Sequence, residues 1–313
     1  LSARRTYFDY LLPKILPVET AEKIPPYYFY DLQGHVFSDL NEKDRISVSI
    51  YRGIDDLIFD NLGLTADWGN NTYSLSFRRV FNEKLVGNFL VASSEFFTNF
   101  NLGGDDGLNS ENKILDQTLS ANLTFFQSSD LEWRTGAQIK QLDFKYLNTF
   151  LEDTSFYIGE NPIEAGFYTK LKWKGFSRFI IEPGVRYNYY SVYSSTPYID
   201  LRLGAKYLLT DDRYINIALG NYHQFIQTVQ DDYNPTILDS WLAVDNSIDP
   251  AEAQQAVIGY EEYIRDIYKI QIEAYYKTIQ NMLTFEDFRS STDAEVSDEK
   301  ISDTFTLADG YAY

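Results

Sequence analysis

Hydrophobic and polar residues alternate along much of this chain with a period of two, which predicts β-strands. From Phe179 to Tyr189 the odd positions are mainly apolar, whereas the even positions include Glu182, Arg186 and Asn188. The same alternation occurs in the segments 45–50, 73–78, 131–139, 165–173, 197–208 and 269–278. Strands of this kind present one apolar face and one polar face.

Short polar turns recur between these strands at regular intervals. They fall near residues 38–44, 81–84, 128–130, 174–177, 210–213 and 265–266, and much longer connections rich in acidic and aromatic residues are expected between them. Such a rhythm is typical of an up-and-down transmembrane β-barrel, with tight turns at the periplasmic side and long loops outside. The pattern predicts about fourteen antiparallel strands, all-β, with an irregularity near 182–184 because Pro183 cannot donate to the ladder.

Charge is confined to one face of the predicted strands. Because a Lys or Arg turned into lipid near the bilayer midplane costs about 2–4 kcal/mol, this face is expected to line the lumen. The predicted lumen-lining residues are Arg78, Arg134, Lys140, Lys170, Lys172, Glu182, Arg186, Asp200, Arg202, Lys206, Glu273 and Lys277. In an open barrel they would set ion selectivity, and in a plugged one they would bond to the plug.

Hydropathy alone does not separate a barrel from a soluble protein. Mean hydropathy is −0.34, but a barrel strand shows lipid only every second side chain. No stretch approaches the ~20 apolar residues of a membrane helix, so a barrel is the remaining way to cross a membrane. Aromatic residues make up 17% of the chain, which suits aromatic girdles at the two interfaces, although a Tyr-rich soluble β-sandwich remains an alternative.

The chain is strongly acidic, with 46 Asp and Glu against 27 Lys and Arg and a formal net charge of −19. Nucleic-acid binding requires basic residues that neutralise phosphates, so no nucleic-acid partner is expected. Much of the acidic excess falls in the predicted loops, where it would either attract cations or keep the loops hydrated.

Few residues are suited to catalysis, and we expect no enzyme activity. The chain has no cysteine, which excludes thiolate chemistry, and its two histidines are His35 and His223. His35 is expected to be a solvated residue near a periplasmic turn. His223 has the same strand parity as Leu219, which favours an outward orientation above the lipid.

Ligand contacts are expected from the outer end of this strand and from the following loop, 227–249. Aromatic and polar groups on a loop above a rigid barrel form a plausible platform, although self-packing of a long loop would use the same residues. The candidates are Tyr222, His223, Gln224, Asp231, Asp232, Tyr233 and Trp241. The segment Gly103–Asn109 has the composition of a Ca²⁺ loop but not its regular spacing, so no metal or other cofactor is predicted, and Ca²⁺ binding is kept as the alternative.

Several sequence segments resemble the barrels of TonB-dependent outer-membrane receptors, particularly the Bacteroidetes type that carries a carboxypeptidase-like regulatory domain. They are the opening 2–7, the hairpin 27–32 with 41–45, and the segments 182–187, 220–224 and 273–277. The resemblance covers nearly the whole chain. It implies a 22-stranded barrel closed by a plug, of which 1–313 would be an internal part lacking the plug and terminal strands. The first residues also show no export signal.

The resemblance further implies active import, in which outer loops bind a ligand and the TonB–ExbB–ExbD complex supplies energy through the plug. Partners would then include outer-membrane lipids and, in some members, a surface lipoprotein. Two other barrel functions remain open: a complete fourteen-stranded passive channel, and a barrel subunit that mainly assembles with surface lipoproteins. Fold alone does not identify the transported ligand.

Overall fold

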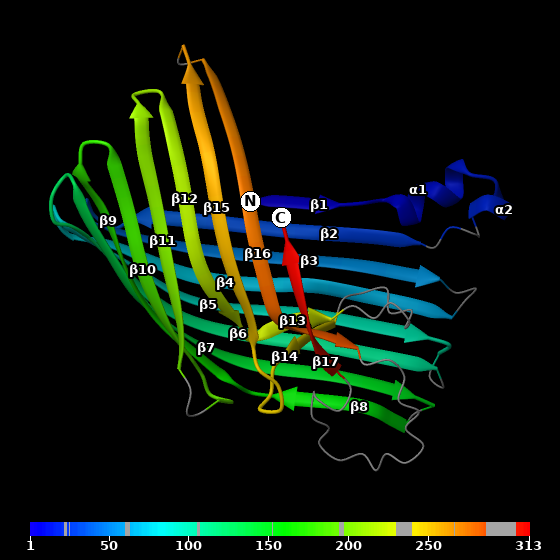
Figure 1. Cartoon of the computed structure of the whole chain (residues 1–313). Helices are drawn as coiled ribbons and strands as arrows, with labels where there is room; N and C mark the ends of the chain where they lie inside the picture. The colour runs from blue at the N-terminus through cyan, green and yellow to red at the C-terminus, as the bar shows by residue number, and fades with distance from the viewer. Residues whose placement is uncertain are drawn as a thin grey trace.

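The computed structural model describes residues 1–21, 24, 26–59, 63–104, 107–151, 153–193, 197–229, 240–265, 267–285 and 305–313. One large antiparallel sheet dominates it and curls into a deep trough (Figure 1). Two short helices, α1 (Phe8–Ile15) and α2 (Val18–Ala21), follow the first strand. No helix in the described part of the chain is long and apolar enough to cross a membrane.

The main path of the sheet contains fourteen strands, each paired to the next, as the alternation predicts. They are β1 (Ser2–Arg5), β2 (Tyr27–Asp39), β3 (Asp44–Phe59), β4 (Leu64–Asn82), β5 (Leu85–Leu102), β6 (Leu108–Phe126), β7 (Leu131–Phe150), β9 (Ile163–Phe176), β10 (Phe179–Tyr190), β11 (Tyr198–Thr210), β12 (Arg213–Gln224), β15 (Ala251–Ile264), β16 (Tyr268–Phe285) and β17 (Phe305–Ala312). A further strand, β8 (Asp153–Glu160), pairs with β7 beside this path. A separate hairpin is formed by β13 (Ile226–Val229) and β14 (Ser240–Ala243).

Tight turns join the strands at one end of the trough, where the sequence predicts them. The connections between β4 and β5 and between β11 and β12 contain only two residues each. At the opposite end a long segment, 6–26, lies between β1 and β2, whereas the prediction of much longer connections is wrong between β3 and β4 and between β5 and β6. There β5 ends at Leu102 and β6 begins at Leu108, because residues assigned to a loop continue the ladder.

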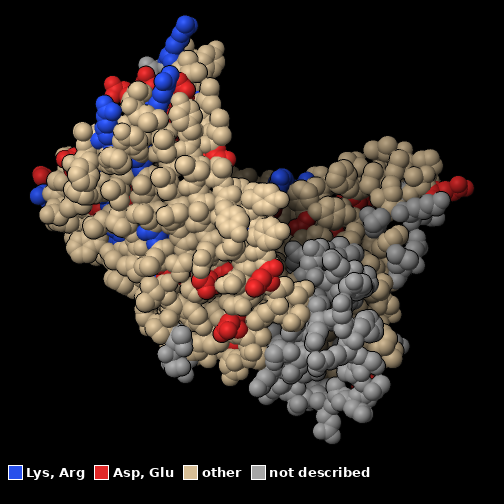
Figure 2. Space-filling view, viewed as in Figure 1, with Lys and Arg blue, Asp and Glu red and all other residues tan. Residues whose placement is uncertain are grey.

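Cross-strand partners show that each strand keeps one face throughout the sheet. One row of partners runs Val36, Val48, Leu75, Val91, Leu119 and Ile139, all on the convex side. These side chains are 44–72% exposed, with no protein layer over them. Figure 2 shows the same property at β10–β16, where a broad face carries few charges and both basic and acidic groups gather at the tight-turn end. This convex surface is the one that fits lipid.

The strands are longer than a bilayer requires. Strands β4 to β7 contain 18 to 20 residues, whereas a tilted transmembrane strand needs ~9–11. On β6 and β7 the convex side changes from apolar to polar beyond Leu119 and Ile139, where Gln117 and Gln141 follow. The far halves of these strands therefore lie outside the lipid, as an extracellular zone.

The concave side changes in the opposite sense at the same level. Lys140 and Asp116 are followed on it by Leu142 and Ile114, which are 0% and 9% exposed. The wall thus has a polar inner face where its outer face meets lipid, and an apolar inner face where its outer face meets water. An apolar inner face can be buried only if something packs on it.

The irregularity expected near 182–184 is present as a gap in the pairing with β9, but Pro183 does not shift the register. Pairs on either side of it, Ile181 with Trp173 and Gly184 with Lys170, share one register. The register shift lies earlier, between Phe179 and Ile181. Pro183 leaves a gap in the pairing with β9 while its pairing with Leu203 of β11 continues.

Candidate functional site

The hairpin formed by β13 and β14 lies inside the trough and bridges two distant parts of its wall (Figure 1). On one side, Asn112 of β6 donates to the Trp241 carbonyl at 2.9 Å and accepts from the Trp241 amide at 3.0 Å. On the other side, Gln227 donates to the Asn281 carbonyl at 3.2 Å and accepts from the Leu283 amide at 3.0 Å. We call this hairpin the crossbar.

Both anchoring amides are buried, Asn112 at 1% and Gln227 at 6% exposure. Each satisfies one donor and one acceptor on an edge of the backbone that has no neighbouring strand, because among the described strands Trp241 pairs only with Thr228 of β13 and Leu283 only with Leu307 of β17. Because an unpaired buried amide or carbonyl costs about 1–3 kcal/mol, these contacts fix the position of the crossbar. The sequence predicts either a ligand platform or a self-packed loop at 227–249, and the described residues of this loop pack against the wall inside the trough.

An apolar cluster fills the space between the crossbar and the wall. It includes Leu142 and Phe144 of β7, Tyr190 of β10, Phe225 and Leu242. The rings of Tyr190 and Phe225 stack with centroids 4.6 Å apart. This cluster buries the apolar inner face of the extracellular zone, which explains why β7 changes its pattern there.

The connection after β10 secures the base of the crossbar. The Tyr193 hydroxyl donates to the carbonyls of Asp245 and Ile248. Burial, reinforced by the nearby Tyr198 and acidic groups, raises the pKa of the Tyr193 phenol. The phenol therefore stays protonated at neutral pH and remains a donor.

The inner face of β2 to β5 in the extracellular zone carries a second feature, an aromatic wall that we define as Tyr27, Phe29, Trp68 and Phe96. Tyr27 and Trp68 stack at 6.4 Å, and Phe96 meets Trp241 of the crossbar edge-on at 6.1 Å. All these side chains are partly exposed, so they are accessible from the trough. Phe96 is thus the member of the wall that contacts the crossbar.

A carboxylate is built into the aromatic wall. The Tyr27 hydroxyl donates to Asp55 Oδ1 at 2.5 Å. Burial and then the adjacent Asp55 raise the pKa of Tyr27, at the extracellular end of β2, to about 12. Tyr27 consequently remains a neutral donor that holds Asp55 between two rings, where the carboxylate can accept hydrogen bonds from a ligand.

The sequence-predicted ligand residues are only partly brought together. Tyr222, His223 and Gln224 end β12, and Trp241 lies on the crossbar, whereas Asp231, Asp232 and Tyr233 fall outside the described residues. The Arg202 guanidinium lies 4.7 Å from the Tyr222 ring centre. Of the candidates, Trp241 alone contacts the aromatic wall through a described ring pair.

The outward orientation predicted for His223 is wrong. Its Nδ1 lies 2.7 Å from Asp200 Oδ1, and its side chain is only 11% exposed. The reason is a break in the ladder at Asn221, whose side chain accepts from the Leu201 amide and donates to the Ile199 carbonyl. Beyond it β11 and β12 separate, and His223 fills the gap against Asp200 and Tyr198.

Sequence reasoning missed the aromatic wall, Asn112 and Gln227. A signal was present, because Trp68 has the strand parity of Ser74, Ser76 and Arg78, which belong to the polar face. A large aromatic residue at a lumen-facing position marks the level where the wall leaves the membrane. The partner of Asn112 is 129 residues away, and no local pattern could identify it.

All predicted lumen-lining residues share the concave face of the sheet. Four cations, Arg134, Lys170, Arg202 and Lys277, occupy one cross-strand row that also passes through Gly184, Gly220 and Gln255. The rest, namely Arg78, Lys140, Lys172, Glu182, Arg186, Asp200, Lys206 and Glu273, lie on neighbouring rows of the same face.

Neighbouring carboxylates neutralise many of these cations. Lys172 lies 2.7 Å from Glu182, and Arg134 pairs with Glu132. Within the described ranges, Lys170 and Lys277 have no carboxylate within 4 Å. We call the cross-strand row that contains Arg134, Lys170, Arg202 and Lys277 the basic row. It therefore retains positive charge that faces the trough.

The described residues contain no group of three His, Asp or Glu side chains arranged to hold a metal. The Ca²⁺-like segment cannot be compared in full, because Asp105 and Asp106 fall outside the described residues. Its glycines Gly103 and Gly104 have φ of 94° and 76°, which is the ordinary geometry of a tight turn.

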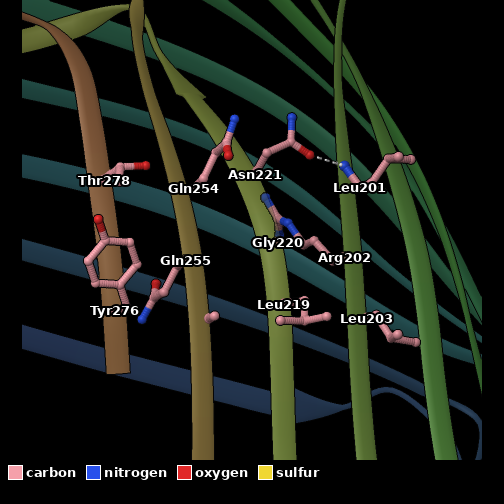
Figure 3. A pocket seen from close by; sticks show the side chains of 11 residues that line it. Leu201, Arg202, Leu203, Leu219, Gly220, Asn221, Gln254, Gln255, Tyr276 and Thr278 are labelled. Carbon is pink, nitrogen blue, oxygen red and sulfur yellow. Dashed lines mark hydrogen bonds between the residues drawn. The ribbon is translucent and has the colours of Figure 1, made fainter. Parts of the chain in front are cut away.

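A hollow of about 470 Å³ lies at β11, β12, β15 and β16 (Figure 3). Its apolar lining comes from Leu203, Leu219, Ala256 and Tyr276, which belong to one convex row. It therefore opens toward lipid and away from the aromatic wall. The candidate ligand site is the aromatic wall with the crossbar, inside the trough.

Comparison with known proteins identifies the family. Residues 18–307 match the model described as "TonB dependent receptor-like, beta-barrel". No curated protein matches the chain.

Solved structures share the fold at low sequence identity. The ferripyoverdine receptor of the Pseudomonas aeruginosa outer membrane is 13% identical with a TM-score of 0.66, covering 91% of this chain and 46% of its own. The siderophore receptor PirA of P. aeruginosa is 11% identical with a TM-score of 0.64, covering 91% and 52%. The RagAB peptide transporter is 9% identical with a TM-score of 0.56, covering 84% and 42%.

This chain thus spans about half the length of the structures that it matches, such as the 46% of the ferripyoverdine receptor. The fourteen-strand meander, the lipid-fitting convex face and the family match agree with one another. The chain belongs to the TonB-dependent receptor β-barrel family of the outer membrane, a family of receptors and not of enzymes.

Proposed function

We propose that this chain forms the central part of the barrel of an active importer, which binds its ligand from outside the cell and passes it through a plugged lumen. The observation that carries the proposal is the aromatic wall joined to the crossbar. It places a preformed, partly exposed surface in the extracellular zone, directly above the polar inner face of the membrane-spanning zone. A ligand bound there would lie at the entrance of the lumen.

The chemistry of this surface suggests the kind of cargo. Aromatic rings stack on planar or apolar groups, and Asp55 accepts hydrogen bonds or pairs with a cation. A net charge of −19 disfavours polyanions. Proteins that share this fold include siderophore receptors, a peptide transporter and a copper transporter, and the first two of these cargo classes carry such groups. We propose a neutral or cationic cargo of one of these two kinds.

The basic row is proposed as a contact for the plug. Lys170 and Lys277 face the trough at the membrane level without nearby carboxylates in the described ranges. Acidic side chains or backbone carbonyls of a plug domain would therefore accept hydrogen bonds from their ammonium groups. Energy would come from the TonB–ExbB–ExbD complex through that domain. The sequence segments 182–187 and 273–277 support the assignment of this receptor to the Bacteroidetes type with a carboxypeptidase-like regulatory domain. A surface lipoprotein partner would be consistent with that type.

Uptake by cells that produce the full-length receptor tests this function. A panel of radiolabelled ferric siderophores and oligopeptides would be offered to cells with TonB, without TonB, and without the receptor. We expect accumulation of at least one probe that requires both the receptor and TonB. Equal receptor-dependent entry with and without TonB would instead establish a passive channel. Retention of a copurifying surface lipoprotein without TonB-dependent uptake would favour an assembly role.

A further inference from the structure

The hollow on the convex face has two chemically different ends. Its lower end is apolar and consists of Leu203, Leu219, Ala256 and Tyr276. Ala256, the smallest of the four, pairs with Leu219 on one side and Tyr276 on the other, so the depression lies over its methyl group. Figure 3 shows Leu219 and Leu203 on neighbouring strands, with Tyr276 across the hollow.

Apart from Leu201 of β11, the convex lining at the upper end of the hollow is polar and uncharged. Asn221 of β12, Gln254 of β15 and Thr278 of β16 follow one another as cross-strand partners on the next convex row. Figure 3 shows these three side chains at one level above the apolar ones. Arg202 also borders the hollow, but it belongs to the concave row, and its guanidinium lies against the Tyr222 ring.

The level of this polar row matches the outer edge of the bilayer. Below it, the convex positions of β12 are Leu219, Ile217 and Ile215, and those of β15 include Ala256 and Ile258. The six residue steps from Ile215 to the polar row at Asn221 extend over about 20 Å along the strand at ~3.4 Å per residue, which is comparable with the ~25 Å apolar band of an outer-membrane barrel. The polar row therefore falls where acyl chains join their headgroups.

Hydrogen-bonding capacity remains in the polar row. Gln254 donates to Glu252 at 3.3 Å, which leaves its amide oxygen and the Thr278 hydroxyl without a partner in the described part of the chain. A convex surface in a membrane is covered by lipid, so a hollow there is filled by lipid tails. A phosphate at this level would require a cation, whereas these neutral groups match an amide and a hydroxyl.

We propose that this hollow binds one acyl chain of an outer-leaflet glycolipid, with the chain over Ala256 and its amide linkage and hydroxyl group bonded to Gln254 and Thr278. The site is independent of the cargo site, because the sheet separates the convex hollow from the aromatic wall. It requires only that the barrel lies in the outer membrane.

Native mass spectrometry of the full-length receptor, extracted from outer membranes in mild detergent, tests the proposal. Ala256→Trp fills the hollow, and Ile258→Trp adds the same bulk on the same convex face outside it. We expect retained glycolipid to fall at least about fivefold in Ala256→Trp and to stay at the wild-type level in Ile258→Trp. Ala256→Leu, a smaller filling, provides a second test if the Trp variant fails to assemble.

A rebinding experiment identifies the lipid class. Delipidated receptor is mixed with purified lipid A or with phosphatidylethanolamine of the same chain length, and the bound lipid is counted. We expect preferential binding of lipid A, reduced several-fold by Gln254→Leu with Thr278→Val. Equal binding of the two lipids, or no loss of glycolipid in either Ala256 variant, would overturn the proposal.

Discussion

At the scale of single residues, Asn112 has the largest structural consequence for the candidate site. Its replacement by alanine would leave the Trp241 amide and carbonyl unpaired in a buried place, at a cost of about 1–3 kcal/mol for each group. We expect Asn112→Ala to accelerate hydrogen exchange of the backbone around Trp241. Asn122→Ala, on the same face of β6 but in the membrane-spanning zone, is the control and should leave that exchange unchanged. Unchanged exchange in Asn112→Ala would show that the crossbar is held in another way.

Trp68 tests the ligand role of the aromatic wall. An aromatic contact contributes about 0.5–1.5 kcal/mol, so Trp68→Ala should weaken cargo binding roughly 2–10-fold. Trp173→Ala removes the same side chain from the convex face near the tight turns and should not affect binding. The measurement is a cargo titration of both purified full-length variants. Equal affinities for the two variants would move the cargo site away from this wall.

Leu203 and Arg202 test the assignment of the two faces. Leu203 lies on the lipid-facing side and Arg202 on the inner side. A buried cation on the lipid side costs about 2–4 kcal/mol at the midplane and less toward the interface. Leu203→Arg should therefore reduce the folded, heat-modifiable barrel on a gel much more than Arg202→Leu. If both variants assemble equally, the register of β11 is wrong.

At the scale of elements, the alternation of residues determined most of the sheet but not its extracellular half. The tight turns and the number of strands follow from local pattern, because every transmembrane strand meets lipid on one side and a polar lumen on the other. The pattern inverts beyond Leu119 and Ile139, so the continuing strands look like loops in the sequence. The crossbar depends on contacts between β6 and residues more than one hundred positions later, which periodicity does not encode.

The crossbar itself can be removed without breaking the sheet. Strands β12 and β15 pair directly from Arg213 with Glu262 to Gln224 with Ala251, so replacing 226–243 by a short Gly–Ser linker leaves this ladder intact. We expect the shortened receptor to assemble in the outer membrane and to lose most cargo binding. Cargo affinity at the wild-type level would show that the crossbar is only a packing element.

At the scale of the whole molecule, the same sheet meets lipid in its lower zone and water in its upper zone. Its lower zone is apolar outside and polar inside, and its upper zone is polar outside and apolar inside. Ion pairs on the upper convex surface, such as Lys113 with Glu95 at 2.8 Å and Lys145 with Glu111 at 2.7 Å, belong in water. This two-zone arrangement places the aromatic wall and the crossbar outside the bilayer.

Cysteine labelling on intact cells tests this arrangement most directly, because the chain has no cysteine of its own. Single cysteines would replace Lys113 in the upper zone, Leu119 in the lower zone and Ser129 in a tight turn. A membrane-impermeant maleimide should label Lys113→Cys on intact cells, label Ser129→Cys only after the outer membrane is permeabilised, and leave Leu119→Cys unlabelled. Labelling of Leu119→Cys, or of Ser129→Cys but not Lys113→Cys on intact cells, would contradict the account.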